Sequence, residues 1–500
     1  MKINQPPFIL LAVLSLLSSA SMAQDAKVGS LPSSAAGSSE DVLPFSDPTN
    51  MGNWVLRKDI SDEFEGDEID SSKWFVEGAG GDYYIWKGRA PSQFAPHNVI
   101  VEDGKLKIRS QWEPDFDFAK DEGHEGNTYR THKGKDVPVT TGAVVSRKRF
   151  LNGYMEVKSK AGDSAMTAAF WAIGYESELD VFEQMGRPNK DTNGDGVVDP
   201  GLDITADSTK MSVHDWQPPA KRPTRKFGYT KKLPFRTADD FHVYGCEWGE
   251  DYLKCFIDGE LVYETTQAKE GKHWVLTNPL EIWLDSEIFV WLGLPTQDEL
   301  PTDFEVEYMR VWQKPRTNLL DRAFFGFEGP FLFQDQPRPL DLVPESSENN
   351  DYQQFWKIDE QSAKHLSIVR HENFASGTRS LKFRTDGQLA ADSVVATSPK
   401  GTVDLDAGNF ELAVKVQVDA KSTAKTMRLS LIDSDVLLAE IDLSSLPRDQ
   451  WVNVTRRFTL QQPASANDQL TISFDKSDVP AGPNLIYVDD VAVQRASKSR

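Results

Sequence analysis

The chain contains 500 residues, including 13 tryptophans, and carries a formal net charge of −22 at neutral pH. This length exceeds what one ordinary hydrophobic core holds, so we expect two folded domains, and a normal hydrophobic share of 39% excludes a largely disordered chain. The acidic charge disfavours nucleic acids and anionic membranes as partners.

The N-terminal residues 1–23 have the composition of a signal peptide. Lys2 supplies a positive charge, residues 8–17 form an apolar run, and a small-x-small sequence ends at Ala23, before Gln24. The apolar run is too short to span a bilayer as a mature helix, and the residue directly after the cleavage site is Gln24, not a cysteine that could carry a lipid. We therefore predict an exported protein, secreted or periplasmic, without a membrane anchor, and we expect a monomer.

The rest of the chain alternates as β-strands do. Residues 24–49 are rich in Ser, Ala, Gly and Asp, which predicts a disordered leader. Short alternating runs such as residues 153–158, separated by Gly, Pro, Asn and Asp, then predict a β-sandwich over residues 50–315. After a linker at residues 316–322, similar runs predict a second β-sandwich over residues 323–497, so the expected fold class is all-β.

Three acids occupy one predicted strand, and the third is out of phase with the others. Glu178 and Asp180 are two residues apart and would share one face of the strand, whereas Glu183 would point to the opposite face. One extra residue in a strand shifts every later side chain to the other face. A β-bulge at residues 181–182 would therefore align all three carboxylates.

Three aligned carboxylates have a known chemical use. Like charges at close range raise one another's pKa, and glycoside hydrolysis needs one ionised carboxylate to attack the sugar and one protonated carboxyl to protonate the leaving oxygen. The spacing alone is also compatible with a solvated, acidic edge strand. The wider sequence around the motif has to separate these two interpretations.

An acidic loop follows the predicted catalytic strand. Asp191, Asn193, Asp195 and Asp199 supply oxygen atoms at positions 1, 3, 5 and 9, with Gly at position 6, which is the spacing of an EF-hand-like Ca²⁺ loop. Position 12 is not acidic, and Asp203 lies one residue further on. We predict a structural Ca²⁺ with these ligands, and a plain acidic turn is the alternative.

The two cysteines lie in predicted strands joined by a turn at residues 249–251. If the turn is centred there, Cys246 faces Cys255 across the hairpin. Export would permit a disulfide between them. Cross-strand geometry is often unsuitable for a disulfide, so two buried free thiols are the alternative.

The motif from Glu178 to Glu183 resembles the signature of glycoside hydrolase family 16. This resemblance implies a concave β-jelly-roll that hydrolyses β-glycosidic bonds with retention and needs no cofactor for the chemistry. It also implies that Glu178 is the nucleophile, that Glu183 is the general acid/base and that Asp180 assists the nucleophile. Further stretches similar to this family lie at residues 60–66, 141–146, 153–157, 169–171 and 308–312.

Two stretches, residues 86–94 and 285–296, resemble the agarase, porphyranase and carrageenase branch of the family. That branch cuts galactans of red-algal cell walls, which implies an endo-enzyme that cleaves β-1,4 bonds in agarose, porphyran, furcellaran or carrageenan. A laminarinase-like β-glucanase and a non-catalytic polysaccharide-binding protein are the alternatives.

Candidate substrate contacts are aromatic and polar residues near the predicted cleft. Sugar rings stack on aromatic faces, although a strand Trp is more often a core residue. Residues 217–236 contain seven Lys or Arg and no acid, which would attract a sulfated galactan or form an ordinary solvated loop. The candidates are Trp86, Arg89, Trp171, His214, Trp216, Glu287 and Trp291, with Trp283 as a further aromatic candidate.

The predicted C-terminal sandwich resembles galactose-binding-like carbohydrate-binding modules through residues 325–329 and 487–491. In such folds an early Glu and a late Asp can hold a structural Ca²⁺, which would involve Glu328 and Asp490. The resemblance implies that this domain binds the polymer, and a spacer domain is the alternative.

Overall fold

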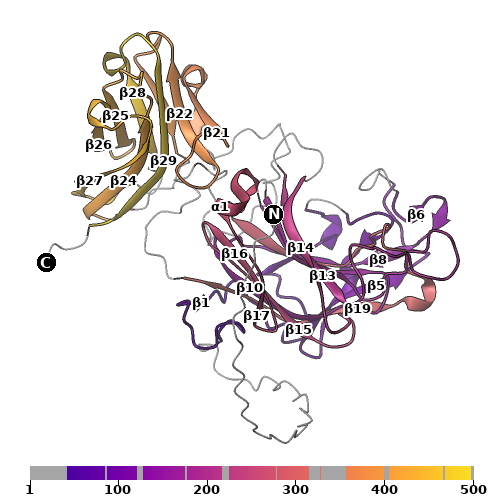
Figure 1. Cartoon of the computed structure of the whole chain (residues 1–500). Coiled ribbons are helices and arrows are strands. Elements are labelled where there is room, and N and C mark those ends of the chain that lie inside the picture. The colour runs from indigo at the N-terminus through magenta and orange to yellow at the C-terminus, as the bar shows by residue number, and fades with distance from the viewer. Residues whose placement is uncertain are drawn as a thin grey trace, which may run out of the picture. The chain divides into compact units, whose positions relative to one another are not determined.

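A computed structural model gives the structure of the chain. It describes residues 42–84, 87–120, 128–174, 177–216, 224–277, 279–314, 327, 356–398, 405–465 and 468–496. Nearly all regular structure in these residues is β-strand, as Figure 1 shows. The described part of the chain has a single α-helix, α1 (Gln267–Glu270), so the all-β expectation is confirmed.

Two sheets pack face to face in the N-terminal sandwich. The first sheet has the order β17 (Glu260–Thr266), β16 (Tyr252–Ile257), β15 (His242–Trp248), β10 (Gly153–Lys160), β19 (Thr302–Gln313), β5 (Lys105–Trp112), β8 (Val139–Thr141), β3 (Gln93–Phe94), with β1 (Val55–Leu56) on β19 and β4 (Val99–Glu102) on β5. The second has the order β14 (Thr224–Lys232), β13 (Ser208–Asp215), β12 (Ser177–Met185), β11 (Thr167–Gly174), β18 (Leu280–Asp285), β9 (Ala143–Ser146), β2 (Trp74–Val76).

The core lies between these sheets because each strand turns its apolar side chains inward. On β12, Leu179 and Phe182 are fully buried, and the Phe182 ring contacts Phe170 of β11 and Tyr244 of β15. Burying such side chains contributes about 1.5–3 kcal/mol each. The inward anchoring of Leu179 and Phe182 fixes which face of β12 its acids occupy.

The register of β12 contains the predicted bulge. Asp180 pairs with Ser212 of β13, whereas Glu183 pairs with Lys210, so three steps along β12 match two steps along β13. The pairing of β12 with β11 shifts at the same place, because Phe182 is opposite Phe170 while Asp180 is opposite Trp171. The extra residue returns Glu183 to the face that carries Glu178 and Asp180.

The hairpin of β15 and β16 has the predicted pairing. Cys246 is directly opposite Cys255, and Gly249 closes the turn by donating its backbone N–H to the carbonyl of Tyr252. Both cysteines are buried free thiols, with their sulfur atoms 3.6 Å apart. Cys246 and Cys255 therefore do not form a disulfide in this structure and are two buried free thiols.

Residues 43–49, which the sequence assigns to the disordered leader, lie against the first sheet instead. The backbone N–H of Phe45 donates to Glu156 Oε2 at 2.9 Å, and the Tyr308 hydroxyl donates to Oε1 at 3.0 Å. Burial raises the pKa of Glu156 to about 7, and these donors partly oppose the shift. A fully buried carboxyl needs such partners, which explains why this segment is ordered.

A second β-sandwich follows at the C-terminus. One sheet has the order β20 (Lys357–Ile358), β23 (Ser393–Thr397), β28 (Leu470–Asp475), β25 (Thr426–Leu431), β26 (Val436–Asp442). The other has the order β21 (Leu366–Arg370), β22 (Arg379–Thr385), β29 (Asn484–Arg495), β24 (Gly408–Val418), β27 (Trp451–Leu460). Its core has its own set of buried side chains, such as Phe383 and Phe474, whose rings stack 4.1 Å apart.

Of the two predicted calcium ligands of this domain, only Asp490 lies in the described part of the chain. Asp490 forms an ion pair with Lys415 at 2.7 Å and accepts a hydrogen bond from the Ser376 hydroxyl. A lysine at this distance neutralises the carboxylate that Ca²⁺ would need. Glu328 lies outside the described residues, as do the linker at residues 316–322 and the predicted signal peptide.

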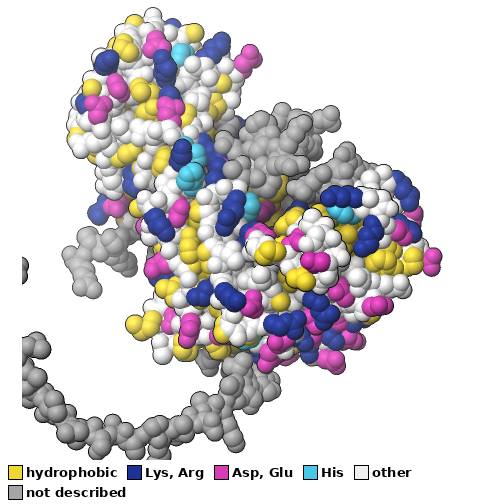
Figure 2. All heavy atoms as spheres, turned by 45° about the vertical axis from the view of Figure 1, so that its right-hand side comes forward, with side chains coloured by type: hydrophobic (Ala, Val, Ile, Leu, Met, Phe, Trp, Pro, Cys, Tyr) yellow, Lys and Arg dark blue, Asp and Glu magenta, His cyan; other side chains and the backbone are white. Residues whose placement is uncertain are grey.

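The described residues include no helix long and apolar enough to cross a membrane. Figure 2 shows acidic and basic side chains interspersed over the face in view. Ion pairs join neighbouring strands of the first sheet, such as Lys158 with Glu307 and Arg109 with Asp303.

Candidate active site

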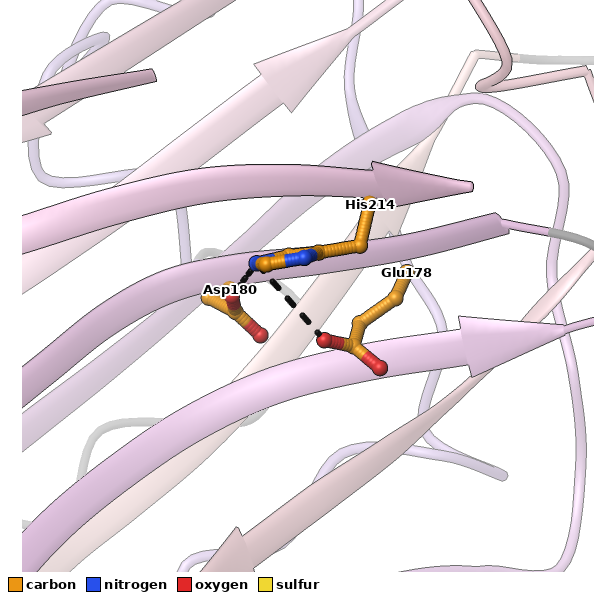
Figure 3. A group of neighbouring side chains, drawn as sticks. All are labelled: Glu178, Asp180 and His214. Atoms are coloured by element: carbon orange, nitrogen blue, oxygen red, sulfur yellow. Dashed lines mark ion pairs between the residues drawn. The ribbon is translucent and has the colours of Figure 1, made fainter. Parts of the chain in front are cut away.

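Glu178, Asp180 and His214 form one cluster on neighbouring strands. Glu178 of β12 is directly opposite His214 of β13, and Asp180 is opposite Ser212. Figure 3 shows the three side chains pointing toward one another. The His214 Nε2 atom lies 3.2 Å from Asp180 Oδ2 and 4.0 Å from Glu178 Oε1. The strand register therefore builds the predicted centre.

Trp216 completes the surroundings of Glu178. It follows the end of β13, and its indole N–H donates to Glu178 Oε2 at 2.5 Å. A hydrogen bond to a carboxylate favours the ionised form. Trp216 was expected to stack on sugar, and the structure shows that its polar edge orients the predicted nucleophile.

Burial and like charge control the protonation of this cluster. Burial raises the pKa of Glu178 to about 8, with a further contribution from Asp180. Burial, followed by the charge of Glu183, raises the pKa of Asp180 well above its usual range. Two interacting carboxyl groups lose their protons in two steps that belong to the pair. Because both pKa values are high, the pair keeps a proton under neutral conditions.

His214 adds no positive charge to this cluster at neutral pH. Burial lowers its pKa below the ordinary value, although Glu178 and Glu183 oppose that shift. The imidazole Nε2 atom contacts Asp180 Oδ2 at 3.2 Å, so the ring limits the orientations that this carboxyl group can take. The sequence offered His214 as a substrate contact, and the structure places it beside Glu178 and Asp180, in contact with Asp180.

Glu183 faces the same side of the sheet from beyond the bulge. It lies between Ala169 of β11 and Lys210 of β13. Its Oε2 atom is 3.4 Å from the Lys210 ammonium, which also lies 2.9 Å from Asp203 Oδ2. The side chain of Glu183 is 18% exposed, so solvent or a substrate can reach it.

A second pair of acids lies beside this centre, at the end of β18. Asp285 accepts a hydrogen bond from the Trp171 indole at 2.6 Å. Glu287 accepts from the backbone N–H and the Nε of Arg89, at 3.0 and 3.1 Å. Burial raises the pKa of both acids, and the Arg89 guanidinium opposes the shift at Glu287. Arg89 and Glu287 therefore form a fixed unit rather than two independent contacts.

The aromatic candidates divide between core and surface. Trp171 stacks at 4.9 Å on Trp283, which is fully buried and belongs to the core. Trp291 is 38% exposed and stacks at 4.4 Å on Phe289. The Arg89 guanidinium lies over both of these rings, 5.1 Å from Phe289 and 5.6 Å from Trp291. Trp86 lies outside the described residues.

The basic stretch contributes Arg225 to this face of the sheet. Residues 217–223 are not described, but Arg225 pairs with His214 through an irregularity in the β13–β14 register. The Arg225 side chain is exposed and donates to the Ser212 hydroxyl at 3.2 Å. A Cβ atom at Gly228 would approach the Met211 carbonyl oxygen to 2.2 Å and Arg225 Nη2 to 2.8 Å, so the close packing of β14 on β13 requires a glycine here.

The predicted calcium loop is an exposed turn held by its own side chains. Asp191 accepts hydrogen bonds from the backbone N–H groups of Gly194 and Gly196, at 2.7 and 2.8 Å, and Asn193 accepts from Asp195 N at 3.0 Å. These oxygens suit a hard cation. Within the described residues, however, the carboxylates of this loop do not gather into a group of three.

Asp203 does not fit the proposed ligand set. Its carboxylate forms an ion pair with Lys210, next to Glu183. The sequence missed both this contact and Lys210, although residues 210, 212 and 214 alternate onto one face of a strand. The even spacing between Lys210 and His214 is therefore the sequence pattern that could have identified Lys210 as a residue of this site.

Among the described residues, the cluster of Glu178, Asp180 and His214 is a group that could hold a metal ion. One ligand atom each from Glu178, Asp180 and His214 lies within 4.8 Å of the others. Paired carboxylates hydrolyse glycosides without a metal ion, so the chemistry that this geometry offers uses protons and a nucleophile from the chain.

Known proteins resemble the N-terminal sandwich. Beta-porphyranase E of Zobellia galactanivorans is 26% identical over 280 residues, which cover 53% of this chain and 88% of that protein. Kappa-carrageenase of Pseudoalteromonas carrageenovora is 25% identical over 295 residues, covering 53% of this chain and 66% of that protein. The crystal structure of porphyranase B from Zobellia galactanivorans is 23% identical, with a TM-score of 0.40, and covers 52% of this chain and 92% of that one.

A family model matches the same part of the chain. The family model described as "Beta-porphyranase A-D, GH16 domain" matches residues 54–314. This range spans more than half of the chain and contains both glutamates and the strands that position them. The protein therefore belongs to glycoside hydrolase family 16 and is a glycoside hydrolase.

Proposed function

We propose that the protein is a retaining, endo-acting glycoside hydrolase that cleaves β-1,4 bonds in a red-algal galactan. The bulge in β12 carries this proposal, because it places Glu183 on the face that holds Glu178 and Asp180. A regular strand would turn Glu183 into the core, away from its partner. Two carboxyl groups on one face of a sheet meet the requirement of glycoside hydrolysis.

The mechanism has two steps. In the first, Glu178 attacks the anomeric carbon while Glu183 gives its proton to the glycosidic oxygen, so the bond to the leaving sugar breaks and a glycosyl ester forms. In the second, Glu183 takes a proton from water, which displaces Glu178 from the sugar. Burial raises the pKa of both Glu178 and Asp180, and the charge of Asp180 adds to the shift at Glu178, so the two carboxyl groups titrate as a coupled pair.

An anionic polymer suits the basic groups near this centre. Among the described residues, no carboxylate lies within ion-pair distance of Arg225, which is paired with His214 in the β13–β14 register and donates to Ser212. A guanidinium without a carboxylate partner can bind a sulfate ester through two parallel hydrogen bonds. The names of the relatives refer to porphyran and κ-carrageenan. These names support a red-algal galactan as the substrate class.

The further proposals concern the rest of the chain. We propose export through the N-terminal 23 residues and polymer binding by the C-terminal sandwich, on the sequence resemblances given above. Detection of mature protein that begins at Gln24 in the culture medium would support export. A pull-down of residues 323–497 by insoluble galactan tests polymer binding, and failure to bind any galactan would leave that sandwich as a spacer.

The catalytic role of Glu178 is tested by Glu178→Gln. The substitution keeps the size of the side chain but removes the nucleophile, so product release from the cleaved galactan should fall on the order of 10⁴-fold or more. The measurement is reducing-sugar release from agarose, porphyran, furcellaran, κ-carrageenan and laminarin. Glu260→Gln, at an exposed position of β17, is the control and should leave the rate unchanged.

The substrate panel also separates the alternatives. Release from laminarin alone would identify a β-glucanase. If the wild-type protein binds a polymer but cuts none, the protein is a binding protein, and the catalytic role of Glu178 is wrong.

The role of Asp180 is tested by the pH dependence of Asp180→Asn. Activity on the acid side rises with pH as Glu178 ionises, and burial together with Asp180 sets that pKa at about 8. The amide removes the negative neighbour and still donates a hydrogen bond. The acid limb of kcat/KM should therefore move to lower pH, by about one unit. An unchanged acid limb would show that Asp180 does not influence the nucleophile.

The role of Arg225 is tested by Arg225→Met on a sulfated galactan and its desulfated form. Losing a charge-assisted contact costs about 1.5–3 kcal/mol, so kcat/KM should fall at least tenfold on the sulfated polymer only. Lys231→Met is the matched control. Lys231 is exposed on the same strand, but it pairs with Thr209 and therefore lies away from His214. An equal loss on both polymers would contradict sulfate recognition.

We further propose that the loop of Asp191, Asn193, Asp195 and Asp199 binds Ca²⁺ without Asp203. Binding to the native state alone raises the unfolding temperature. Adding Ca²⁺ should therefore raise the Tm of the wild type and of Asp203→Asn, but not of Asp191→Asn. If Ca²⁺ has no effect on the wild type, the loop is a plain acidic turn.

A further inference from the structure

Lys210 lies directly beside the proposed acid/base residue. The bulge brings Glu183 opposite Lys210 in the β12–β13 register, and the Lys210 ammonium lies 3.4 Å from Glu183 Oε2. The same ammonium lies 2.9 Å from Asp203 Oδ2. The Lys210 side chain is only 17% exposed, so its position is defined by these two carboxylates. No role for it follows from the proposed reaction.

A lysine in this position has a definite chemical consequence. Burial alone would lower the pKa of Lys210, but the carboxylates of Glu183 and Asp203 raise it overall. Lys210 is therefore cationic over the range in which the enzyme would work. A cation within about 4–6 Å favours the ionised form of a carboxyl group. By the same interaction, Lys210 favours ionised Glu183.

The other titratable groups around Glu183 are acids, whose charge opposes that of Lys210, or bases that carry no free positive charge. Glu178 and Asp180 lie on the same strand, and Asp285 and Glu287 lie at the end of β18. These acids disfavour a further negative charge. The guanidinium of Arg89 is committed to Glu287, and burial keeps His214 neutral at pH 7. Lys210 is thus the cation in direct contact with Glu183 among the described residues.

The two-step reaction explains why such a balance is useful. Glu183 must be protonated to release the leaving sugar and ionised to activate water in the second step. The neighbouring acids favour the first state, and Lys210 favours the second.

We propose that Lys210 is a positioning residue that balances the protonation of Glu183, and that Asp203 limits its effect by sharing the ammonium. This inference rests on the proposed role of Glu183 as acid/base. Removing Asp203 leaves Lys210 to Glu183 alone and also removes a nearby negative charge. The two substitutions, at Lys210 and at Asp203, should therefore act in opposite directions.

The test compares pH profiles of kcat/KM for the wild type, Lys210→Met and Asp203→Asn on the polymer that the wild type cuts. The basic limb reports the loss of the Glu183 proton. Lys210→Met should move this limb to higher pH by about one unit. Asp203→Asn should move it to lower pH by less, because the Asp203 side chain is 45% exposed and its charge is screened by solvent.

Two further variants distinguish charge from packing. Lys210→Arg keeps the cation and should keep the basic limb near that of the wild type, whereas a merely structural lysine would tolerate Met as well as Arg. Lys231→Met removes an exposed lysine of the neighbouring strand β14 and should leave the basic limb of the pH profile unchanged. A basic limb that stays unchanged in Lys210→Met, or that moves the same way in both test variants, would overturn the proposal.

A second measurement works without a substrate. In protein labelled with ¹³C at the Glu carboxyl carbon, the Glu183 signal is assigned by its loss in Glu183→Gln. Its titration midpoint should rise in Lys210→Met and fall in Asp203→Asn, even if every polymer tested is left uncut. An unmoved midpoint would overturn the role of Lys210. Absence of any polymer cleavage, with the midpoints moving as expected, would contradict only the proposed function.

Discussion

One extra residue in β12 is the constraint on which the site depends. Leu179 and Phe182 are both buried between the sheets, although a regular strand would turn residues three apart to opposite faces. The bulge satisfies both anchors, and it does so only by returning Glu183 to the side of Glu178. Core packing and catalysis therefore select the same local geometry. Without the bulge, Glu183 would face the core together with Leu179. Phe182 would then face the opposite side and leave its place in the core empty.

Crowding of like charges is the second feature of the site, and hydrogen-bond donors keep it stable. Asp180 and Asp285 are nearly inaccessible to solvent. Each has a neutral partner from an aromatic or imidazole ring, namely His214 for Asp180 and Trp171 for Asp285. Neutral partners of this kind hold a carboxyl group in place and favour its ionised form less strongly than an adjacent ammonium would. Lys210 touches Glu183 alone among these acids, and the structure thus treats the proposed acid/base differently from its neighbours.

Much of this could be predicted from the sequence because it follows from period-two alternation. The bulge, the opposition of the two cysteines and the all-β fold required only strand patterns and turn residues, and all three are confirmed. The contacts of Asp203 and Phe45 could not be predicted, because a loop and an N-terminal segment reach the sheet through long-range packing. Asp203 looked like a metal ligand by spacing and instead pairs with a lysine. Trp216 was identified by its aromatic face, whereas its N–H makes the contact that matters.

The central claim is that Glu178 forms a covalent bond to the sugar while Glu183 transfers protons. The most direct measurement is mass spectrometry of Glu183→Gln after brief incubation with a galactan oligosaccharide that carries an activated leaving group. Such a leaving group departs without a proton from residue 183, and the second step is slow without a base. The account predicts a sugar mass on the peptide that contains Glu178. A sugar on another residue, or a product with inverted anomeric configuration and no adduct, would contradict it.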